Sequence, residues 1–482
     1  MPVDWKTEIC VIGGGPAGAT VARRLTRLGH QVLLVEQHPF PRSHVGESLS
    51  PGILPLLDVL EVRDCIESAD FFRPQRALIR WRNKLEYVHW EPHEPGFQVD
   101  RGVFDLLLLN LAAQSGVKLV QPGRALSTVA DPTGGWLVAI EHRGRLRQAK
   151  AEFIIDASGK HSRMPPKRRR TSPPTLALYG YWRETGIDGC ESRVEAGERC
   201  WFWGAPLPQR TLNAAVFLDA RLCKIAGSDG VECLYRGLLS ESTLLRRCLN
   251  GKLVNRVIAC DASSYRTDAP VGTSFIKVGE ACFAIDPLSS QGVQAAMQSA
   301  LQASIVCHTI LNTPANTSAA MQFYRVRQAQ AVEQHGRWAA RYYAEQNSFR
   351  PHEFWAARAE GAWQARPLPE PSRTRPSEEC CIERSKDAII VETAVIRRDV
   401  VELSPAITHP ELDRPVAFVG EIAVAPLLQA VVSGQTVKDT LHQWSQSVPA
   451  AAALQILHWM VSRRIIVPVT SAAGVNTNGI GE

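Results

Sequence analysis

The residues with the clearest chemical role lie near the start of the chain, where glycines are closely spaced between two apolar runs. Gly13, Gly15 and Gly18 have the spacing GxGxxG, and Glu36 ends the second apolar run. Backbone N–H groups at such a turn hold phosphate oxygens, and a carboxylate at the end of the second apolar run accepts hydrogen bonds from a ribose diol. The pattern therefore predicts a bound dinucleotide, and the acid disfavours a 2′-phosphate.

These residues need a strand, a helix and a second strand to position them. The run Ile9–Ile12 predicts a buried strand, and Pro16 and Ala17 open a helical pattern that stops at Gly29. The run Val32–Val35 predicts the second strand, so the segment has the form of a βαβ unit with the glycines in its first turn. We expect Gly13 to make the tight turn, Gly15 to admit a pyrophosphate, and Gly18 to allow close helix packing.

Length and composition set limits on the rest of the chain. The 482 residues predict two or three domains, and 45% hydrophobic and 21% charged residues are ordinary for a globular protein. The net charge of +6 gives little reason to expect nucleic acid. No apolar stretch is long enough for a membrane span, and the charged residues Asp4, Lys6 and Glu8 at the first predicted strand argue against a signal peptide. The twelve cysteines form no CxxC pair. We therefore expect a cytoplasmic protein with no metal site and no membrane partner.

Three further motifs follow in a fixed order. Arg101 begins a helical pattern, the segment Asp156–Gly159 follows a predicted strand, and Gly279–Val293 runs from another strand through a turn into a helix. Together with the glycine turn, they resemble the class A flavin monooxygenase and flavin-dependent halogenase superfamily over roughly residues 5–345. The resemblance implies FAD as the cofactor. Glu280 stands where that family usually has aspartate, and its carboxylate can still reach a ribitol hydroxyl.

On this resemblance, the residues expected to contact FAD come from the glycine turn, the loop after the second strand and the three later motifs. They are Gly13, Gly15, Pro16, Ala17, Gly18, Glu36, Arg42, Ser48, Arg101, Asp156, Gly159, Glu280, Asp286, Gln291, Gly292 and Val293.

The resemblance also sets the expected architecture, an α/β fold in three parts. A Rossmann-like, glutathione-reductase-like FAD-binding domain would comprise residues 1–80, 95–175 and 265–345. An antiparallel β-sheet substrate domain would comprise 81–94 and 176–264, where strand patterns are rich in aromatic residues. Residues 346–399 read as a linker. Three helical patterns followed by a strand predict a small winged-helix-like module over 400–482.

Two short motifs resemble halogenases and their relatives more specifically. Gly46-Glu47-Ser48-Leu49 resembles the loop that flanks the flavin, and Trp201-Phe-Trp203-Gly-Ala-Pro206 resembles the WxWxIP signature with Ala205 in place of Ile. The candidate catalytic residues are Glu47, His44, Trp201 and Trp203. The alternative for the two tryptophans is that they are core residues on one strand face, since residues i and i+2 share a face.

One halogenase residue is missing. Halogenases carry a lysine that captures hypochlorous acid in the region that resembles Phe72–Trp81, whereas this chain has Gln75 or Arg76 there and its nearest lysine is Lys84. A guanidinium stays protonated and is a poor nucleophile. Oxygen insertion is therefore favoured over halogenation, in a chamber expected to contain no lysine.

The stretch Asp286–Val293 resembles the flavoproteins that mature cysteine tryptophylquinone enzymes. That resemblance implies hydroxylation of a tryptophan side chain in a protein or peptide substrate. The quinohemoprotein amine dehydrogenase type suits the chain length and extra module best, so its small subunit is the expected substrate. O2 would be the oxidant, and NAD(P)H or a separate flavin reductase would donate electrons.

Three alternatives remain open on the sequence. The first is a flavin-dependent halogenase of a small or carrier-bound aromatic substrate, which would require halide for turnover. The second is a non-catalytic flavin-binding scaffold, which would bind FAD without substrate-coupled oxygen uptake. The third is an enzyme similar to geranylgeranyl reductase, which would require a tunnel for an isoprenoid.

Overall fold

The computed structural model describes residues 2–74, 76–89, 96–162, 164–165, 168–222, 230–360 and 376–469. The chain divides into two compact units, Met1–Ala365 and Arg366–Glu482, and each is described by itself. Within the described ranges, no helix is both long and apolar enough to cross a membrane.

The first unit is built on a parallel sheet with strand β1 (Trp5–Ile12) near its centre. β1 pairs with β2 (Val32–Val35) on one side and β10 (Arg145–Asp156) on the other, while β7 (Lys118–Val120) and β19 (Phe275–Lys277) extend the two sides. In this register Ile12 lies opposite both Val35 and Asp156. The predicted turns after these strands therefore meet at one edge of the sheet.

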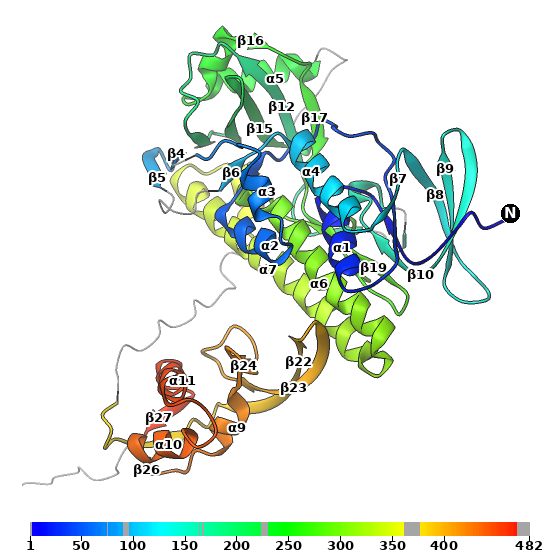
Figure 1. Cartoon of the computed structure of the whole chain (residues 1–482). Helices are drawn as coiled ribbons and strands as arrows, with labels where there is room; N and C mark the ends of the chain where they lie inside the picture. Colours follow the sequence, from blue (N-terminus) through cyan, green and yellow to red (C-terminus); the bar gives the residue numbers. More distant parts are fainter. Residues whose placement is uncertain are drawn as a thin grey trace, which may run out of the picture. The chain divides into compact units, whose positions relative to one another are not determined.

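Helices pack against this sheet and against one another. α1 (Pro16–Arg27) contacts α4 (Arg101–Gln114) and α6 (Gly292–Asn312), and α6 lies beside the long helix α7 (Thr317–Phe349) (Figure 1). α1 buries its small residues because the strand, turn and helix approach closely at Gly18. The Asp100 carboxylate caps α4 by accepting the N–H groups of Gly102 and Val103.

The first half of β10 turns outward into an antiparallel extension. There it pairs with β9 (Trp136–His142), which in turn pairs with β8 (Gly123–Ala130). The sequence pattern predicted the strand that precedes Asp156, which is the end of β10, whereas β8 was not predicted. Most residues of β8 are exposed or half-buried, and its sequence has no regular alternation of apolar and polar residues.

The first unit also contains a second, mixed sheet of eight strands, with the order β16-β12-β15-β14-β13-β4-β5 and β17 paired with β12. Its strands are β4 (Arg76–Trp81), β5 (Lys84–His89), β12 (Thr175–Arg183), β13 (Ser192–Ala196), β14 (Cys200–Leu207), β15 (Thr211–Asp219), β16 (Lys252–Leu253) and β17 (Ile258–Asp261). The predicted boundary between the FAD-binding domain and the substrate domain follows residue 80. Because β4 (Arg76–Trp81) belongs to the second sheet, the boundary lies before this strand and not within it.

Alternate residues of β15 serve the two faces of the second sheet. Leu212, Ala214 and Val216 join a core that includes α5 (Gly230–Glu241). Asn213, Ala215 and Phe217 point to the opposite face, as the two-residue period of a strand requires. Part of that face packs against α7 and α8 (Glu353–Ala359), and the rest borders a cavity.

Short elements complete the first unit. They are β3 (Ser48–Leu49), β6 (Phe97–Gln98), β11 (Arg168–Arg170), β18 (Tyr265–Thr267) and β20 (Phe283–Ala284), with helices α2 (Leu54–Val59) and α3 (Arg63–Glu67). β3 pairs with β6, and β11, β18 and β20 form a small antiparallel sheet.

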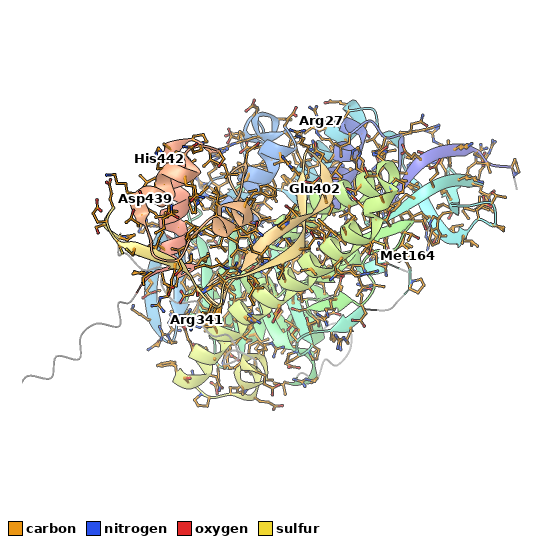
Figure 2. The ribbon with its side chains drawn as sticks, turned by 90° about the horizontal axis from the view of Figure 1, so that it is seen from below. Arg27, Met164, Arg341, Glu402, Asp439 and His442 are labelled. Carbon is orange, nitrogen blue, oxygen red and sulfur yellow. The ribbon has the colours of Figure 1, made fainter. Side chains whose placement is uncertain are left out.

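The C-terminal unit holds three helices and three short antiparallel strands. These are α9 (Val424–Gln429), α10 (Val437–Trp444) and α11 (Ala450–Ser462), with β21 (Cys381–Arg384), β26 (Gln435–Thr436) and β27 (Ile466–Pro468). Asp439 lies in the first turn of α10 and His442 in its last turn (Figure 2). The α/β fold class with a Rossmann-like domain, a substrate-side sheet and a small winged-helix-like module is confirmed, and the substrate-side sheet is antiparallel except for the parallel pairing of β13 with β4.

The bounds predicted for the linker are wrong. The end of α7 and the whole of α8 occupy residues 346–359. The C-terminal unit begins before residue 400, since it contains β21 and a hairpin of β22 (Ile389–Arg397) and β23 (Val400–Thr408). It also contains the paired strands β24 (Phe418–Val419) and β25 (Ile422–Ala423). The strands were missed because the charged residues of this stretch suggested a linker, whereas its apolar residues pair across β22 and β23. Residues 361–375 of the predicted linker lie outside the described residues.

Candidate functional site

A cavity of about 880 Å³ lies between the carboxyl edge of the parallel sheet and the inner face of the second sheet. Most residues predicted to bind cofactor or act in catalysis line it. The lining members of that set are Gly13, Gly15, Pro16, Ala17, Glu36, Arg42, His44, Glu47, Ser48, Arg101, Asp156, Gly159, Trp203, Glu280, Asp286, Gly292 and Val293. Gly18, Gln291 and Trp201 do not line it.

The glycine turn leaves no room for side chains. A Cβ on Gly13 would lie 2.4 Å from the Ala157 carbonyl oxygen, and a Cβ on Gly18 would lie 1.8 Å from the Gly13 carbonyl oxygen. Gly13 also has φ of +106°, a conformation that favours glycine. Gly18 therefore acts through close backbone packing, which explains why it does not line the cavity.

Glu36 closes this turn with both carboxylate oxygens. Its Oε2 accepts the Gly14 N–H at 2.6 Å and its Oε1 accepts the His38 N–H at 2.8 Å. The side chain is buried yet borders the cavity. The carboxylate is thus held at the end of β2, where the sequence pattern placed it.

Arg42 carries an unmatched donor beside the glycines. Its Nε is buried without a hydrogen-bond partner among the described residues, and its Nη2 would lie 3.4 Å from a Cβ on Gly15. The nearest anion recorded is Asp105 Oδ2, at 3.8 Å from Nη2. A cationic donor beside a side-chain-free turn suits a phosphate group.

The Arg101 guanidinium forms hydrogen bonds with neighbouring residues of the protein. Its Nε and Nη2 donate to the two carboxylate oxygens of Asp105 at 2.9 and 3.1 Å, and its Nη1 donates to the Val45 carbonyl at 2.9 Å. Both Arg101 and Asp105 are buried. The pair therefore holds the loop that carries Glu47 against the start of α4.

The Asp156 carboxylate organises the turn that follows β10. Oδ1 accepts the N–H and hydroxyl of Ser158, and Oδ2 accepts the Ser162 hydroxyl at 2.6 Å. Burial lowers the pKa of the neighbouring Lys277, while the Asp156 charge opposes that shift. Asp156 thus fixes the shape of the cavity wall through its own hydrogen bonds.

Lys160 corrects one prediction, because it borders the cavity that was expected to contain no lysine. Its Nζ donates to the Asp261 carbonyl at 2.5 Å and lies 3.8 Å from Glu280 Oε1. It follows β10 at the edge of the parallel sheet, far along the chain from Phe72–Trp81, the segment in which halogenases carry their lysine. Lys84 is exposed on β5 and pairs with Glu86, Arg76 bonds Glu191, and Gln75 lies outside the described residues.

Asp286 is a buried acid next to the N-terminus of α6. The Tyr343 hydroxyl donates to its carboxylate at 3.0 Å, and the Leu288 N–H donates at 2.9 Å. Burial raises the pKa of Asp286 above its ordinary value, against the effect of these bonds. Gln291 precedes α6 and does not reach the cavity.

Glu47 lies where the second sheet meets the loop. Its Oε1 accepts the Tyr181 hydroxyl at 2.6 Å and the Asn213 amide at 3.0 Å, and its Oε2 accepts the Gly46 N–H at 3.0 Å. Burial, and then the Glu47 charge, raise the pKa of Tyr181, and burial raises that of Tyr179 to about 12. Both phenols thus remain protonated near neutral pH and keep their donor hydrogens.

The two tryptophans of β14 differ in position. Trp201 is fully buried and stacks on Phe217 with ring centroids 3.9 Å apart, in the core that includes Trp355. Trp203 borders the cavity. The core alternative therefore describes Trp201, and Trp203 alone of the pair can contact a ligand. His44 also lines the cavity, and its Nδ1 lies 2.7 Å from the Val45 carbonyl oxygen.

Comparison with known proteins identifies the family. The family of FAD dependent oxidoreductases matches residues 8–161. The chain is also 32% identical over 379 residues to a tryptophan 2-halogenase of Chondromyces crocatus. The aligned region covers 74% of this chain and 71% of that protein. The chain belongs to the FAD-dependent oxidoreductase family that includes the flavin-dependent halogenases.

Other relatives of this flavoprotein agree with that assignment. A flavin-dependent halogenase of Armillaria mellea is 29% identical, over 61% of this chain and 64% of its own length, which is less than two thirds. The flavin-dependent halogenase CmlS has the same fold, with a TM-score of 0.78, 19% identity and 97% coverage of both chains. The peptidyl tryptophan dihydroxylase QhpG, essential for tryptophylquinone cofactor biogenesis, matches with a TM-score of 0.74 and 23% identity, over 95% of this chain and 99% of that one.

The protein is therefore an FAD-dependent oxidoreductase, and the cavity fits the cofactor. The turn between β1 and α1 offers N–H groups without side chains, and the unmatched donor of Arg42 lies beside them. The cavity continues from this turn to the inner face of the second sheet, where its lining becomes aromatic.

Sequence reasoning missed several lining residues. Residues 123–128 of β8 border the cavity next to Glu36, and Tyr179, Asn213 and Ser263 border it on the sheet side. The alternation of β15 could have placed Asn213 on one face with Phe217, but only the strand pairing shows which face meets the cavity.

Proposed function

We propose that this flavoprotein is a monooxygenase that hydroxylates a tryptophan side chain of a protein or peptide substrate during tryptophylquinone biogenesis. The observation that carries the proposal is the lysine pattern. Residues 72–83 contain no lysine, and Lys160, the lysine that borders the cavity in the described part of the chain, is bonded to the Asp261 carbonyl. The structural similarity to the peptidyl tryptophan dihydroxylase supports the proposed substrate class.

The cofactor roles follow from position. The N–H groups near Gly13 and Gly15, with Arg42, would hold the pyrophosphate, and Glu36 would accept hydrogen bonds from the adenosine ribose. Glu280 and Asp286 would lie along the ribityl and ring portions. When bound and reduced, the flavin supplies activation of O2 for transfer of an electrophilic oxygen to an electron-rich ring.

The side chains of the second sheet would bind and orient the ring and exclude water. Trp203 and Tyr179 offer aromatic surface, and Glu47 is a buried carboxylate that can accept the ring proton displaced by oxygen. Each hydroxylation consumes one O2, two electrons and two protons, and yields one ring hydroxyl and one water. NAD(P)H or a separate reductase would supply the electrons, and the small subunit of a quinohemoprotein amine dehydrogenase would supply the tryptophan.

A second function, halogenation of an aromatic substrate, is favoured by two findings. The relative with 32% identity is a tryptophan 2-halogenase, and Lys160 supplies an amine at the cavity edge. For Lys160 to capture a hypohalous acid it would have to leave its bond to the Asp261 carbonyl. A non-catalytic scaffold would bind FAD in the same cavity without any product.

Product mass distinguishes these functions. The FAD-loaded protein, a reductase and a tryptophan-bearing peptide are incubated with excess bromide, with the Lys160→Met variant in parallel. We expect peptide masses raised by one and two oxygens, independent of bromide and retained in the variant. A brominated product that disappears in the variant would establish halogenation, and FAD binding without any product would support the scaffold.

A further inference from the structure

The inner face of the second sheet carries a small residue between two large rings. Ala215 of β15 is the direct cross-strand neighbour of Tyr179 in β12 and of Trp203 in β14. All three residues line the cavity. Opposite residues of antiparallel strands place their Cβ atoms about 5 Å apart, so Ala215 forms a floor with an aromatic side chain on either side. We call these three residues the aromatic slot.

Asn213 lies on the same face of β15, one strand repeat from the floor of the slot. Its Nδ2 donates to Glu47 Oε1 at 3.0 Å, and that oxygen also accepts the Tyr181 hydroxyl. A carboxylate oxygen accepts hydrogen bonds, so the amide must present its nitrogen to Glu47 and its Oδ1 elsewhere. The orientation of the carboxamide is thereby fixed.

The fixed orientation leaves an acceptor unmatched. Asn213 borders the cavity, is 1% exposed, and its Oδ1 has no hydrogen-bond partner among the described residues. A buried polar atom without a partner is unfavourable, and a donor brought by a ligand would relieve it. Asn213 and Ala215 are about 7 Å apart along the strand, which is comparable to the length of a fused bicyclic ring.

We propose that Asn213 Oδ1 accepts a hydrogen bond from the ring N–H of an aromatic group held in the aromatic slot. Asn213 then determines specificity, because it favours fused rings that carry an N–H donor over rings of the same shape that lack one. The identification of that ring as a tryptophan side chain rests on the proposed function. The ring preference itself rests on the slot and the unmatched acceptor.

The test compares two rings of nearly equal shape. Indole has the N–H donor, and benzofuran has an oxygen in its place. Each is titrated into the FAD-loaded full chain, and binding is followed by the change in flavin absorbance. We expect indole to bind about five- to tenfold more tightly, the effect of one neutral hydrogen bond. Asn213→Ala should reduce this ratio to about one.

A second variant locates the ring. Ala215→Leu fills the floor of the slot and should weaken both ligands at least about tenfold, with FAD content unchanged. Equal affinities in the wild type, no spectral change with either ring, a preference that survives Asn213→Ala, or unchanged binding in Ala215→Leu would each overturn the proposal.

The same titrations separate this inference from the hydroxylase proposal. A clear preference for indole, with no oxygenated peptide formed, would contradict the hydroxylase and leave the role of Asn213 standing. Oxygenated peptide together with equal affinities for the two rings would do the reverse.

Discussion

The two walls of the cavity are built in different ways. The wall at the edge of the parallel sheet is largely backbone: turns at Gly13–Gly18 and Asp156–Gly159 meet there because their strands are in register. The wall on the second sheet is made of side chains, such as Tyr179, Asn213 and Trp203, presented by strand alternation. The first wall suits a cofactor common to a whole family, and the second can vary with the substrate.

The largest effect is expected in the backbone wall. Gly18→Ala places a Cβ 1.8 Å from the Gly13 carbonyl oxygen, an overlap that only a backbone shift can relieve. We expect FAD content to fall to near zero and the melting temperature to drop, measured by absorbance at the flavin band and by calorimetry.

Gly336→Ala is the matched control for that variant. Gly336 lies within α7 and a Cβ there meets nothing within 4 Å, so the variant should keep its FAD and gain stability of up to about 1 kcal/mol. Normal FAD content in Gly18→Ala would show that the close turn is not required.

The next largest effect tests the connection between the walls. Arg101→Met removes the bidentate partner of Asp105 and leaves this buried carboxylate with only the Arg42 guanidinium, whose Nη2 lies 3.8 Å from Oδ2. We expect a loss of about 3–5 kcal/mol in the free energy of unfolding, measured with urea. Arg101→Met combined with Asp105→Leu should recover much of that loss, and equal stabilities of the single and double variants would contradict the assignment.

Glu47→Gln tests the side-chain wall. Glu47 accepts hydrogen bonds from three donors. The amide of the variant keeps the shape of the side chain, but its N–H₂ group would face at least one of these donors instead of accepting from it. We expect normal FAD content with turnover of a tryptophan peptide reduced about 10²-fold.

Glu195→Gln provides the comparison for Glu47→Gln. Glu195 is a buried acid of the same sheet that does not line the cavity, and it bonds the Ser242 hydroxyl instead. Its replacement should lower stability without changing turnover per folded molecule. Unchanged turnover in Glu47→Gln would remove Glu47 from the chemistry.

A smaller effect distinguishes a buried acid that lines the cavity, Asp286, from one that does not, Asp219, by the pH dependence of their contributions to stability. Burial raises the pKa of Asp286, so its contribution to stability is present below its ordinary value of 3.8 and is lost as the pH rises through its folded value. Burial alone would also raise the pKa of Asp219, but Arg221 and Arg358 outweigh burial and lower it. Its contribution is therefore present above 3.8 and is lost at lower pH.

Urea unfolding of Asp286→Asn and Asp219→Asn between about pH 3 and 7 checks these signs. Relative to the wild type, Asp286→Asn should become more stable as the pH rises. Asp219→Asn should have its largest deficit at neutral pH and a smaller one in acid. Parallel pH profiles for the two variants would contradict the opposite shifts.

The difference between the walls also explains what sequence reasoning could predict. The glycine turn and Glu36 form a local pattern that follows strands, so their roles in the fold were predictable from spacing, whereas the role of the Asp156 turn was inferred from the family resemblance. Glu47 was found through its motif, but its partners Tyr181 and Asn213 lie 134 and 166 residues away. Such contacts depend on the order and register of the strands, which no local pattern specifies.

Charge composition misled the prediction at one further place. The Arg, Pro and Glu content of residues 349–385 suggested a linker, which was predicted over 346–399, yet β21 and β22 pair with β26, β27 and β23. Lys160 was overlooked because its position depends on a contact that is distant in the sequence. It follows the Asp156 turn, and its approach to the cavity depends on the distant Asp261 carbonyl.

The central claim is that the flavoprotein inserts oxygen from O2 into a tryptophan ring, and isotope labelling tests it most directly. The FAD-loaded protein, a reductase and the small subunit of a quinohemoprotein amine dehydrogenase are incubated under ¹⁸O₂ with bromide present. We predict one and then two ¹⁸O atoms on a single tryptophan, located by tandem mass spectrometry, and no bromine. A bromine atom on that ring, or flavin oxidation with no change in the substrate, would contradict the account.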